Sequence, residues 1–201
     1  MTGTGGDDDA SLVTRAQAGD GDAFGVLVRR YEARVYRLVR RIVGEDEAED
    51  ALQETFLSAW RALPRFAGAS TFSTWIYRIA TNAALMRLRK RRADTVSLDA
   101  PAVTGEDATA PPRELVDWGP TPEDALADAE TRAAMDEAIA ALPSEQRAAF
   151  LLRDVEGVAN ADAAAALDLS VPAFKARVHR ARLFLRDRLD RHFTERVRRG
   201  G

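Results

Sequence analysis

Basic side chains gather on one face of the segment that follows Ser170. With 100° between successive residues, Phe174, Val178 and Leu185 form an apolar seam that must face the interior of a domain. The opposite side carries Lys175, Ala176, His179 and Arg180, flanked by Arg177 and Arg182. Lysine and arginine donate hydrogen bonds to O6 and N7 of guanine, and a small alanine permits close approach. The pattern therefore predicts a surface that reads duplex DNA, whereas His179 taken alone would be an ordinary exposed histidine.

A second set of side chains lies on the segment 46–63, whose pattern is helical. One face is apolar and carries Ala48, Leu52, Phe56, Ala59 and Leu63. The other face carries Asp50, Gln53, Glu54, Leu57 and Arg61. A leucine set among carboxylates and an amide is more specific than a merely solvated helix face. This second face is therefore a candidate for binding a partner.

The carboxylates at 45–47 and 49–50 could also be read as acid–base groups or metal ligands. Most of them fall on a solvated helix face, and no nucleophile–base pair or glycine-rich phosphate loop accompanies them. The sequence has no cysteine and only two histidines, His179 and His192, which excludes disulfides, thiol chemistry, cysteine-bound metals and a histidine-rich metal site. We expect no enzymatic activity, no cofactor or metal, and no small-molecule substrate.

The composition is that of an ordinary soluble protein, with 201 residues, 46% hydrophobic and 30% charged. The formal net charge of −3 excludes a uniformly basic coat, so any surface for nucleic acid must be local. Acidic residues are concentrated between 93 and 134, and basic clusters lie on both sides, at 87–92 and 175–199. Each cluster alone could be a solvated helix face. No apolar run approaches the roughly 20 residues that span a bilayer, and we expect a cytoplasmic protein without membrane contact.

The first 93 residues predict four helices that position these surfaces. A short helix at 11–18 is followed by a turn in which Asp22 is the expected N-cap. Apolar residues three and four apart then mark a helix that Gly44 ends. The third helix, 46–63, is stopped by Pro64. A loop at 65–71 leads into a long helix at 72–92, whose aromatic residues Phe72, Trp75 and Tyr77 should include at least one buried ring.

The periodicity collapses at 94–120, where prolines and glycines punctuate acidic and small residues, and we expect a flexible acidic linker. A second helical domain begins at Thr121 and continues with helices up to Leu142, from Ser144 to 155, at 160–167 and at 170–193. The last two are joined by a tight turn at 168–170, with Ser170 as N-cap and the small Ala164 at the crossing. This is the helix-turn-helix arrangement.

The predicted fold class is therefore all-α, with two small helical domains and a helix-turn-helix in the second. The expected boundaries are a disordered tail at 1–10, a first domain at 11–93, the linker at 94–120, a second domain at 121–195 and a tail at 196–201.

Two long motifs carry a resemblance to a known family. Segments 50–60, DALQETFLSAW, and 72–82, FSTWIYRIATN, closely resemble the second domain of extracytoplasmic-function (ECF) RNA polymerase sigma factors. Segments 142–147, LPSEQR, 152–157, LRDVEG, and 170–182, SVPAFKARVHRAR, resemble the fourth domain. Both stand in the right order and are separated by a variable linker.

The resemblance implies a transcription initiation factor that binds core RNA polymerase and directs it to promoters through −10 and −35 elements. Docking on the β′ clamp helices would fall to Asp50, Gln53, Glu54, Leu57 and Trp60. Contacts to the melted −10 strand, with a flipped base captured by the loop, would fall to Phe66, Ser70, Thr71, Trp75, Arg78 and Asn82. The −35 duplex would be read by Lys175, Ala176, Arg177, His179, Arg180 and Arg182. The resemblance further implies packing of the fourth domain on the β flap and, commonly in this family, an anti-sigma factor as partner.

The chain departs from the family pattern in a few places. Met86 stands where a polar residue is common, and Asp168 replaces the frequent glycine of the turn, a position that aspartate tolerates in the left-handed conformation. Ala163 is smaller and Phe174 larger than usual, so the two can compensate in volume. The alternative hypothesis is a stand-alone helix-turn-helix regulator of duplex operators, which would not need the surfaces at 50–60 and 66–82.

Overall fold

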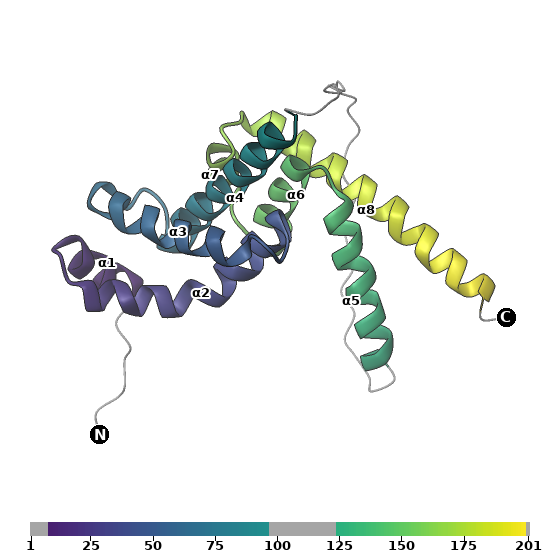
Figure 1. The fold of residues 1–201 in the computed structure, drawn as a ribbon, viewed down its shortest axis with the longest axis horizontal. Helices are drawn as coiled ribbons and strands as arrows, with labels where there is room; N and C mark the ends of the chain where they lie inside the picture. Colours follow the sequence, from purple (N-terminus) through teal and green to yellow (C-terminus); the bar gives the residue numbers. More distant parts are fainter. Residues whose placement is uncertain (1–7, 97–123, 200–201) are drawn as a thin grey trace. The chain divides into compact units, whose positions relative to one another are not determined.

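A computed structural model describes residues 8–96 and 124–199, and side chains at 8–91, 131–191 and 194. Within these ranges every regular element is helical (Figure 1). The chain divides into two compact units, Met1–Asp94 and Thr95–Gly201. The all-α, two-unit class predicted from periodicity is confirmed. Most of the predicted linker, from residue 97 onward, lies outside the described residues, as do 1–7 of the predicted tail.

The first unit contains α1 (Asp9–Gln17), α2 (Gly21–Val43), α3 (Ala48–Ala62), the short 3₁₀ turn η1 (Leu63–Arg65) and α4 (Phe72–Val96). Helix α1 packs on α2, and α2 packs on α3. The core is formed by fully buried apolar side chains, among them Leu12, Leu27, Val35, Leu38, Ile42, Leu63 and Ile76. Burying such side chains supplies about 1.5–3 kcal/mol each, which is the main force that holds these helices together.

The helix ends follow from local chemistry, with one correction. Asp20, and not the expected Asp22, caps α2, because its carboxylate accepts the backbone N–H of Ala23 at 3.0 Å. Asp22 instead sits in the first turn of the helix, where its negative charge favours the helix dipole. Helix α1 is capped by Asp8 and begins at Asp9, inside the segment assigned to the tail. Gly44 ends α2 at φ +97°, as expected.

The second unit contains α5 (Asp124–Ala141), α6 (Ser144–Phe150), the π-helical turn η2 (Leu151–Val155), α7 (Asn160–Ala166) and α8 (Val171–Arg199). Helices α5, α6 and α7 all pack on α8, which runs six residues beyond the predicted end at 193. The expected start at Thr121 lies outside the described residues. Arg147 closes the bend between α5 and α6 by donating to the carbonyls of Ala140 and Leu142.

The turn between α7 and α8 is built as the sequence predicts. Asp168 adopts the left-handed conformation at φ 55°, and Ser170 accepts the N–H of Ala173 at 3.3 Å as an N-cap. The N–H of Leu169 returns to the carbonyl of Ala164 at 2.9 Å. Buried Ala164 and Phe174 fill the shared interior, which holds α8 in a fixed orientation on α7.

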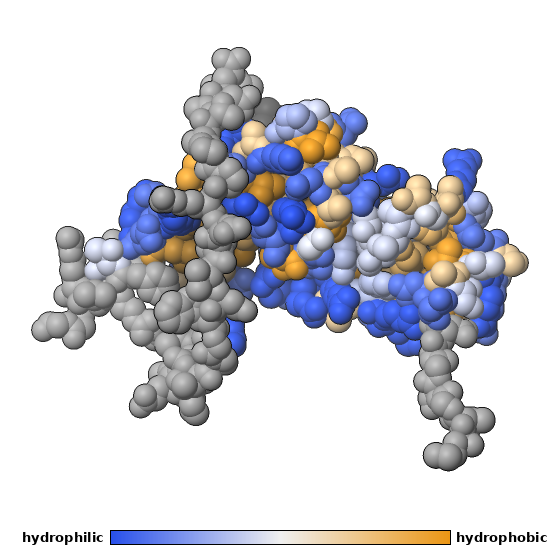
Figure 2. Space-filling model, turned by 180° about the vertical axis from the view of Figure 1, so that it is seen from behind, coloured by the Kyte–Doolittle hydropathy of each residue, from blue (hydrophilic) through white to orange (hydrophobic). Residues whose placement is uncertain are grey.

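The surface is mixed, and in the face that Figure 2 shows, hydrophilic residues are interrupted by hydrophobic patches. Among the residues whose side chains are described, the large apolar ones that remain exposed are Leu57, Trp60, Met86, Val155 and Leu183. Within the described ranges, no helix is both long and apolar enough to cross a membrane.

Candidate nucleic-acid and protein interface

The outer face of α3 presents the predicted docking residues to solvent. Asp50, Gln53 and Glu54 are exposed, and the apolar side chains beside them are unusually open, Leu57 at 49% and Trp60 at 40%. The buried face is formed by Ala48, Ala51, Thr55 and Ala59. Leu52 and Phe56, which were predicted on the apolar face with Ala48, Ala59 and Leu63, are only half-buried, so the helix is rotated slightly from that prediction.

Trp60 stands at the end of α3 against Phe24 of α2, with ring centroids 4.9 Å apart. This contact fixes the indole while leaving much of its surface open, so the ring is ordered before any partner arrives. An ordered and exposed tryptophan among polar groups is a common anchor of protein interfaces.

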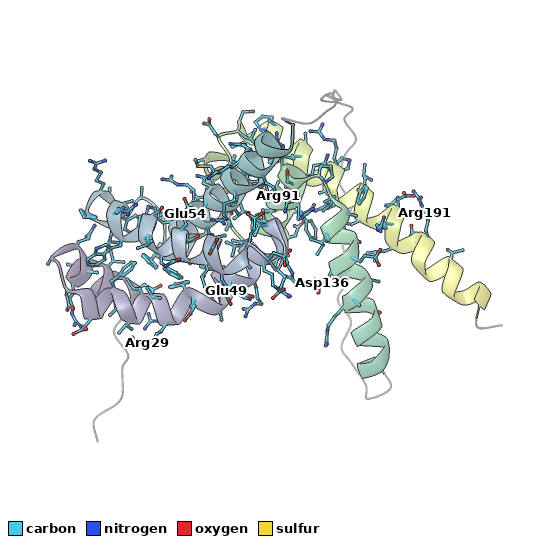
Figure 3. The ribbon with its side chains drawn as sticks, in the orientation of Figure 1. Arg29, Glu49, Glu54, Arg91, Asp136 and Arg191 are labelled. Atoms are coloured by element: carbon cyan, nitrogen blue, oxygen red, sulfur yellow. The ribbon has the colours of Figure 1, made fainter. Side chains whose placement is uncertain are left out.

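Arg87 of α4 reaches across to the same face of α3. Its guanidinium lies 3.2 Å from Glu47, 2.8 Å from Asp50 and 3.6 Å from Glu54. Glu47 and Glu54, with Met86, Arg87, Lys90 and Arg91, line a groove of about 430 Å³ between α3 and α4. Figure 3 labels Glu54 and Arg91 on the two helices. Two of the predicted docking carboxylates therefore face the basic end of α4, a pairing that the sequence analysis did not predict.

A second groove, of about 610 Å³, runs between α2 and α3 beside Gln53. It is lined by Arg29, Glu32, Ala33, Tyr36, Glu49, Leu52 and Gln53, of which Figure 3 labels Arg29 and Glu49. The half-buried Leu52 thus forms part of an open concave surface next to the docking face and is not part of the core.

The loop after η1 is open and rests on aromatic rings. Residues 67–69 and Thr71 are exposed, while Phe66 and Ser70 are half-buried. The Phe66 ring lies 4.8 Å from Trp75 and 6.4 Å from Phe72. Thr71 caps the start of α4 by accepting the N–H of Thr74 at 3.2 Å. The loop is thus held at both ends while its middle stays accessible.

Trp75 does not occupy the place predicted for it. It is only 7% exposed, and its ring is packed against Phe66 and Phe72, so it has little free face on which a base could stack. The aromatic residues Phe72, Trp75 and Tyr77 are all buried, which confirms the prediction of at least one buried ring. In this conformation Trp75 supports the loop from beneath.

A groove of about 380 Å³ opens between the loop and α1. Phe66, Ser70, Thr71 and Phe72 line one side, and Asp9, Thr14 and Gln17 lie on the other. The amide Nε2 of Gln17 donates to the carbonyls of Leu63 at 3.0 Å and Phe66 at 2.7 Å. Helix α1, to which the sequence analysis gave no functional role, therefore holds the loop and completes the groove.

On α4 the predicted contacts Arg78 and Asn82 begin a stripe with a spacing of four residues, which Met86 and Lys90 continue. Arg78, Asn82, Met86 and Lys90 are all exposed, and Met86 is 64% exposed. A cation, an amide, a thioether and a second cation can together follow a nucleic-acid strand, because phosphates, base edges and base faces each find a suitable group.

The face of α8 is less uniform than predicted. Lys175 is fully exposed, but Ala176, His179 and Arg180 are half-buried. Nε2 of His179 is buried and finds no hydrogen-bond partner among the described residues, so it is not offered to a base in this conformation. Arg177 pairs with Glu145 at 2.7 Å, and Arg182 binds Asp154 through two hydrogen bonds of 2.9 and 2.6 Å.

The ion pairs of Arg177 and Arg182 could not be predicted from a helical wheel. Arg177 is tied to α6 and Arg182 to η2, so each helps to fasten α8 to its own unit. The hydrogen bonds to Asp154 raise the pKa of Arg182 further above its ordinary value. A helical wheel places residues around one axis and contains no information about acids on a neighbouring helix. In the described part of the chain, no group of three or more acidic or histidine side chains is arranged to hold a metal ion.

Comparisons with known proteins agree with this layout. The model of Sigma-70 region 2 matches residues 27–93, and that of Sigma-70 region 4 matches 132–185. The ECF RNA polymerase sigma-E factor of Salmonella typhimurium is 36% identical over 176 residues, covering 87% of this chain and 90% of the relative. Its counterpart in Haemophilus influenzae is 33% identical over 183 residues, covering 90% and 95%. The structure of CnrH in complex with the cytosolic domain of CnrY superposes with a TM-score of 0.61 at 28% identity, covering 92% of this chain and 98% of that one.

Proposed function

Since this chain belongs to the ECF RNA polymerase sigma factors, we propose that its two helical units divide promoter recognition between them. A sigma factor binds core RNA polymerase and directs it to promoters. The first unit would dock on the polymerase through α3 and bind the melted −10 strand through the loop and α4. The second unit would bind the intact −35 duplex through α8.

The docking proposal is supported by the exposed apolar side chains on α3. Leu57 and Trp60 are surrounded by Asp50, Gln53 and Glu54, an arrangement of apolar centre and polar rim that resembles protein interfaces. The acidic rim favours a basic partner surface, which we propose to be the β′ clamp helices. The open groove between α2 and α3 extends this surface.

The −10 proposal is supported by the groove between the loop and α1. A base taken out of its stack costs a few kcal/mol, which a fitted pocket must offset. The half-buried Phe66 provides apolar ring surface at the groove, and such a surface contributes about 1–3 kcal/mol for a stacked base. Arg78, Asn82 and Met86 then carry the strand along α4. Trp75 is proposed to support Phe66 and not to touch DNA itself.

The −35 proposal is supported by the position of Lys175 near the start of a well-anchored α8. Lys175, Ala176 and Arg180 are the proposed contacts with DNA, and His179 would have to turn to bring Nε2 to a base. Arg177 and Arg182, because they are paired within the unit, are proposed to orient the helix and to reach phosphates only from its margins.

The single observation that carries the whole proposal is that the first unit exposes both a docking face and a nucleic-acid groove. A stand-alone operator-binding regulator would need neither of them. We further propose an anti-sigma factor that covers these faces, since the similar CnrH was solved bound to a second protein, the cytosolic domain of CnrY, and a cytoplasmic location, where core polymerase acts.

Reconstitution tests the proposal directly. Core polymerase supplemented with the full chain is expected to transcribe a defined promoter set from genomic DNA, and sequencing the transcripts identifies that set. Binding of the chain alone to duplex DNA, with no start sites added to those of core polymerase, would contradict the proposal in favour of the stand-alone regulator.

A further inference from the structure

Helix α1 forms one whole side of the groove at the loop, and it lies outside the segment 27–93 that matches region 2. Resting on the proposed capture of a base by the loop, we propose that α1 reads the edge of that base. Oxygen acceptors on Gln17 and Thr14 select adenine or cytosine over guanine and thymine. Adenine and cytosine carry an exocyclic amine at C6 and C4, where guanine and thymine carry a carbonyl.

The hydrogen bonds of Gln17 determine which of its atoms is available. Both N–H donors of an amide are needed to serve two carbonyl acceptors, and Nε2 serves Leu63 and Phe66. The Oε1 atom accepts from no group in the described part of the chain. Gln17 therefore contributes an acceptor to the groove, and its orientation is fixed by the loop that it holds.

Thr14 adds a second acceptor one helical turn earlier. Its hydroxyl donates to the carbonyl of Ala10 at 2.9 Å, which uses its one proton and leaves its lone pairs free to accept. Asp9 adds a carboxylate to the same wall. No arginine or lysine is among the residues that line this groove, so the wall suits the amine of a base and is unsuited to a phosphate.

The opposite wall has the complementary character. The backbone N–H groups of 67–71 have no hydrogen-bond partner among the described residues. Adenine and cytosine each present an amine donor beside a ring-nitrogen acceptor, so the amine can meet α1 while the ring nitrogen accepts from the loop. Guanine and thymine would turn a carbonyl oxygen toward the acceptors of α1, which leaves those oxygens without a donor.

The wall of α1 is rigid enough to discriminate. Leu12, Val13 and Ala16 are buried against the unit. The carboxylate of Asp9 accepts from Arg30 and Tyr31, and Asp20 receives two hydrogen bonds from Arg15 at 3.0 and 2.8 Å. An acceptor held in place by such contacts disfavours the wrong base more strongly than one that can move aside.

A promoter library with the melted strand randomised tests the inference in the full holoenzyme. One position is expected to favour adenine and cytosine by at least about fivefold, which corresponds to about 1 kcal/mol, the lower end of what a good base contact supplies. The variant Phe66→Leu, which removes the stacking ring, should weaken discrimination at that position and so identify it. Thr14→Val should lower the preference there alone.

The variant Gln17→Ala tests both roles of this residue, recognition of the base and support of the loop. It should slow all promoters, because the loop loses its brace, and should also reduce the amine preference at the identified position. Ser11→Ala, on the exposed side of α1 away from the groove, is the matched control and should change neither. A uniform loss with unchanged preference in Gln17→Ala and Thr14→Val, or a preference for guanine or thymine at that position, would overturn the inference. Absence of any promoter-dependent transcription would instead refute the proposed function.

Discussion

Arg87 of α4 donates to Asp50 of α3 at 2.8 Å and so joins the helix proposed to bind DNA to the helix proposed to bind polymerase. The same guanidinium lies within 4 Å of Glu47 and Glu54. Glu47 is the most enclosed of the three acids and also faces Arg91 at 3.4 Å, so the network closes the groove between the two helices. Arg87 approaches Asp50 and Glu54 from the α4 side only. Both carboxylates remain exposed, so a partner can still reach them.

Replacing Arg87 by alanine should destabilise the first unit. The partly buried Glu47 and the exposed Asp50 lose their cation, and we expect a loss of about 1 kcal/mol, the upper end for such pairs, because one partly buried guanidinium joins three carboxylates. Urea unfolding followed by tryptophan fluorescence measures this loss, which should shrink in high salt. Arg87→Lys should recover only part of the stability, because an ammonium cannot hold several carboxylates at once. Equal stability of the alanine variant and the wild type would contradict the network.

Substitutions on the proposed docking face of α3 should weaken polymerase binding without lowering the stability of the protein. Leu57→Ala should weaken binding to core polymerase on the order of tenfold, because an exposed leucine at the centre of an interface loses buried area only in the complex. Its thermal unfolding should not change, since the side chain is half open in the free protein. Gln53→Ala and Glu54→Ala should also lower the affinity.

The variant Trp60→Ala should behave differently from Leu57→Ala. This variant removes the contact with Phe24 as well, so it should lose both stability and polymerase affinity. Pull-down of core polymerase at several concentrations measures affinity, with Ser11→Ala as control. Unchanged binding by Leu57→Ala, Gln53→Ala and Glu54→Ala would mean that the docking face lies elsewhere.

The face of α8 predicts different consequences for two of its cations. Lys175→Ala should weaken binding of −35 duplex DNA and reduce the salt dependence by about one unit of slope, because one phosphate or base contact is lost. Its stability should not change, since Lys175 is exposed. Arg182→Ala should instead lower stability by about 0.5–1 kcal/mol, discounted for the partial exposure of its pair with Asp154.

Holoenzyme binding to promoters over a range of salt, together with thermal unfolding, distinguishes these two roles. Asp154→Asn serves as the partner control, since it should reproduce the stability loss of Arg182→Ala while leaving the arginine present. If Arg182→Ala reduced the salt slope as much as Lys175→Ala and left stability intact, Arg182 would be a direct DNA contact.

Local chemistry in the sequence was enough to predict most helices and their ends. The spacing of Leu27, Tyr31 and Val35 marks a buried stripe, and Gly44 and Ser170 act where their residue types favour ends and caps. The prediction of Asp22 as N-cap was wrong, because Asp20 is an equally good cap and only the exact start of the helix decides between them.

What the sequence could not predict depends on contacts between distant segments. Arg87 and Asp50 are 37 residues apart, and Gln17 and Phe66 are 49 residues apart. Periodicity shows which face of a helix is apolar, but the partner helix and the rotation that brings particular polar groups together are set by tertiary packing. The assignment of Trp75 to DNA came from the family resemblance, which does not show that Phe66 and Phe72 pack against its ring.

The stability of the first unit should depend on the ionisation of Tyr31 at high pH. Burial, with the hydrogen bond to and the negative charge of Asp9, raises the pKa of Tyr31 to about 12. In the unfolded chain the phenol ionises near pH 10, so the stability that this group contributes is complete below pH 10. It declines as the pH rises from about 10 to about 12, where the unfolded chain has already lost the proton that the folded protein keeps.

Absorbance of tyrosinate against pH measures this directly. Tyr31→Phe should remove the step at highest pH, and Asp9→Asn should move that step toward lower pH because the negative acceptor is gone while burial remains. The step staying in place in both variants would show that another tyrosine produces it.

The turn of the helix-turn-helix predicts opposite effects of two substitutions at Asp168. The backbone of Asp168 has φ 55°. Aspartate tolerates this left-handed conformation and glycine adopts it without strain, whereas a β-branched residue is strained by about 1–2 kcal/mol. Asp168→Val should therefore lower the thermal stability of the second unit, whereas Asp168→Gly should leave it unchanged or raise it slightly. Because the N–H of Leu169 ties this turn to Ala164, a distorted turn should also tilt α8 and weaken −35 binding in the valine variant. Equal stability of the valine and glycine variants would mean that the turn relaxes to another conformation, and −35 binding would then report whether the orientation of α8 depends on it.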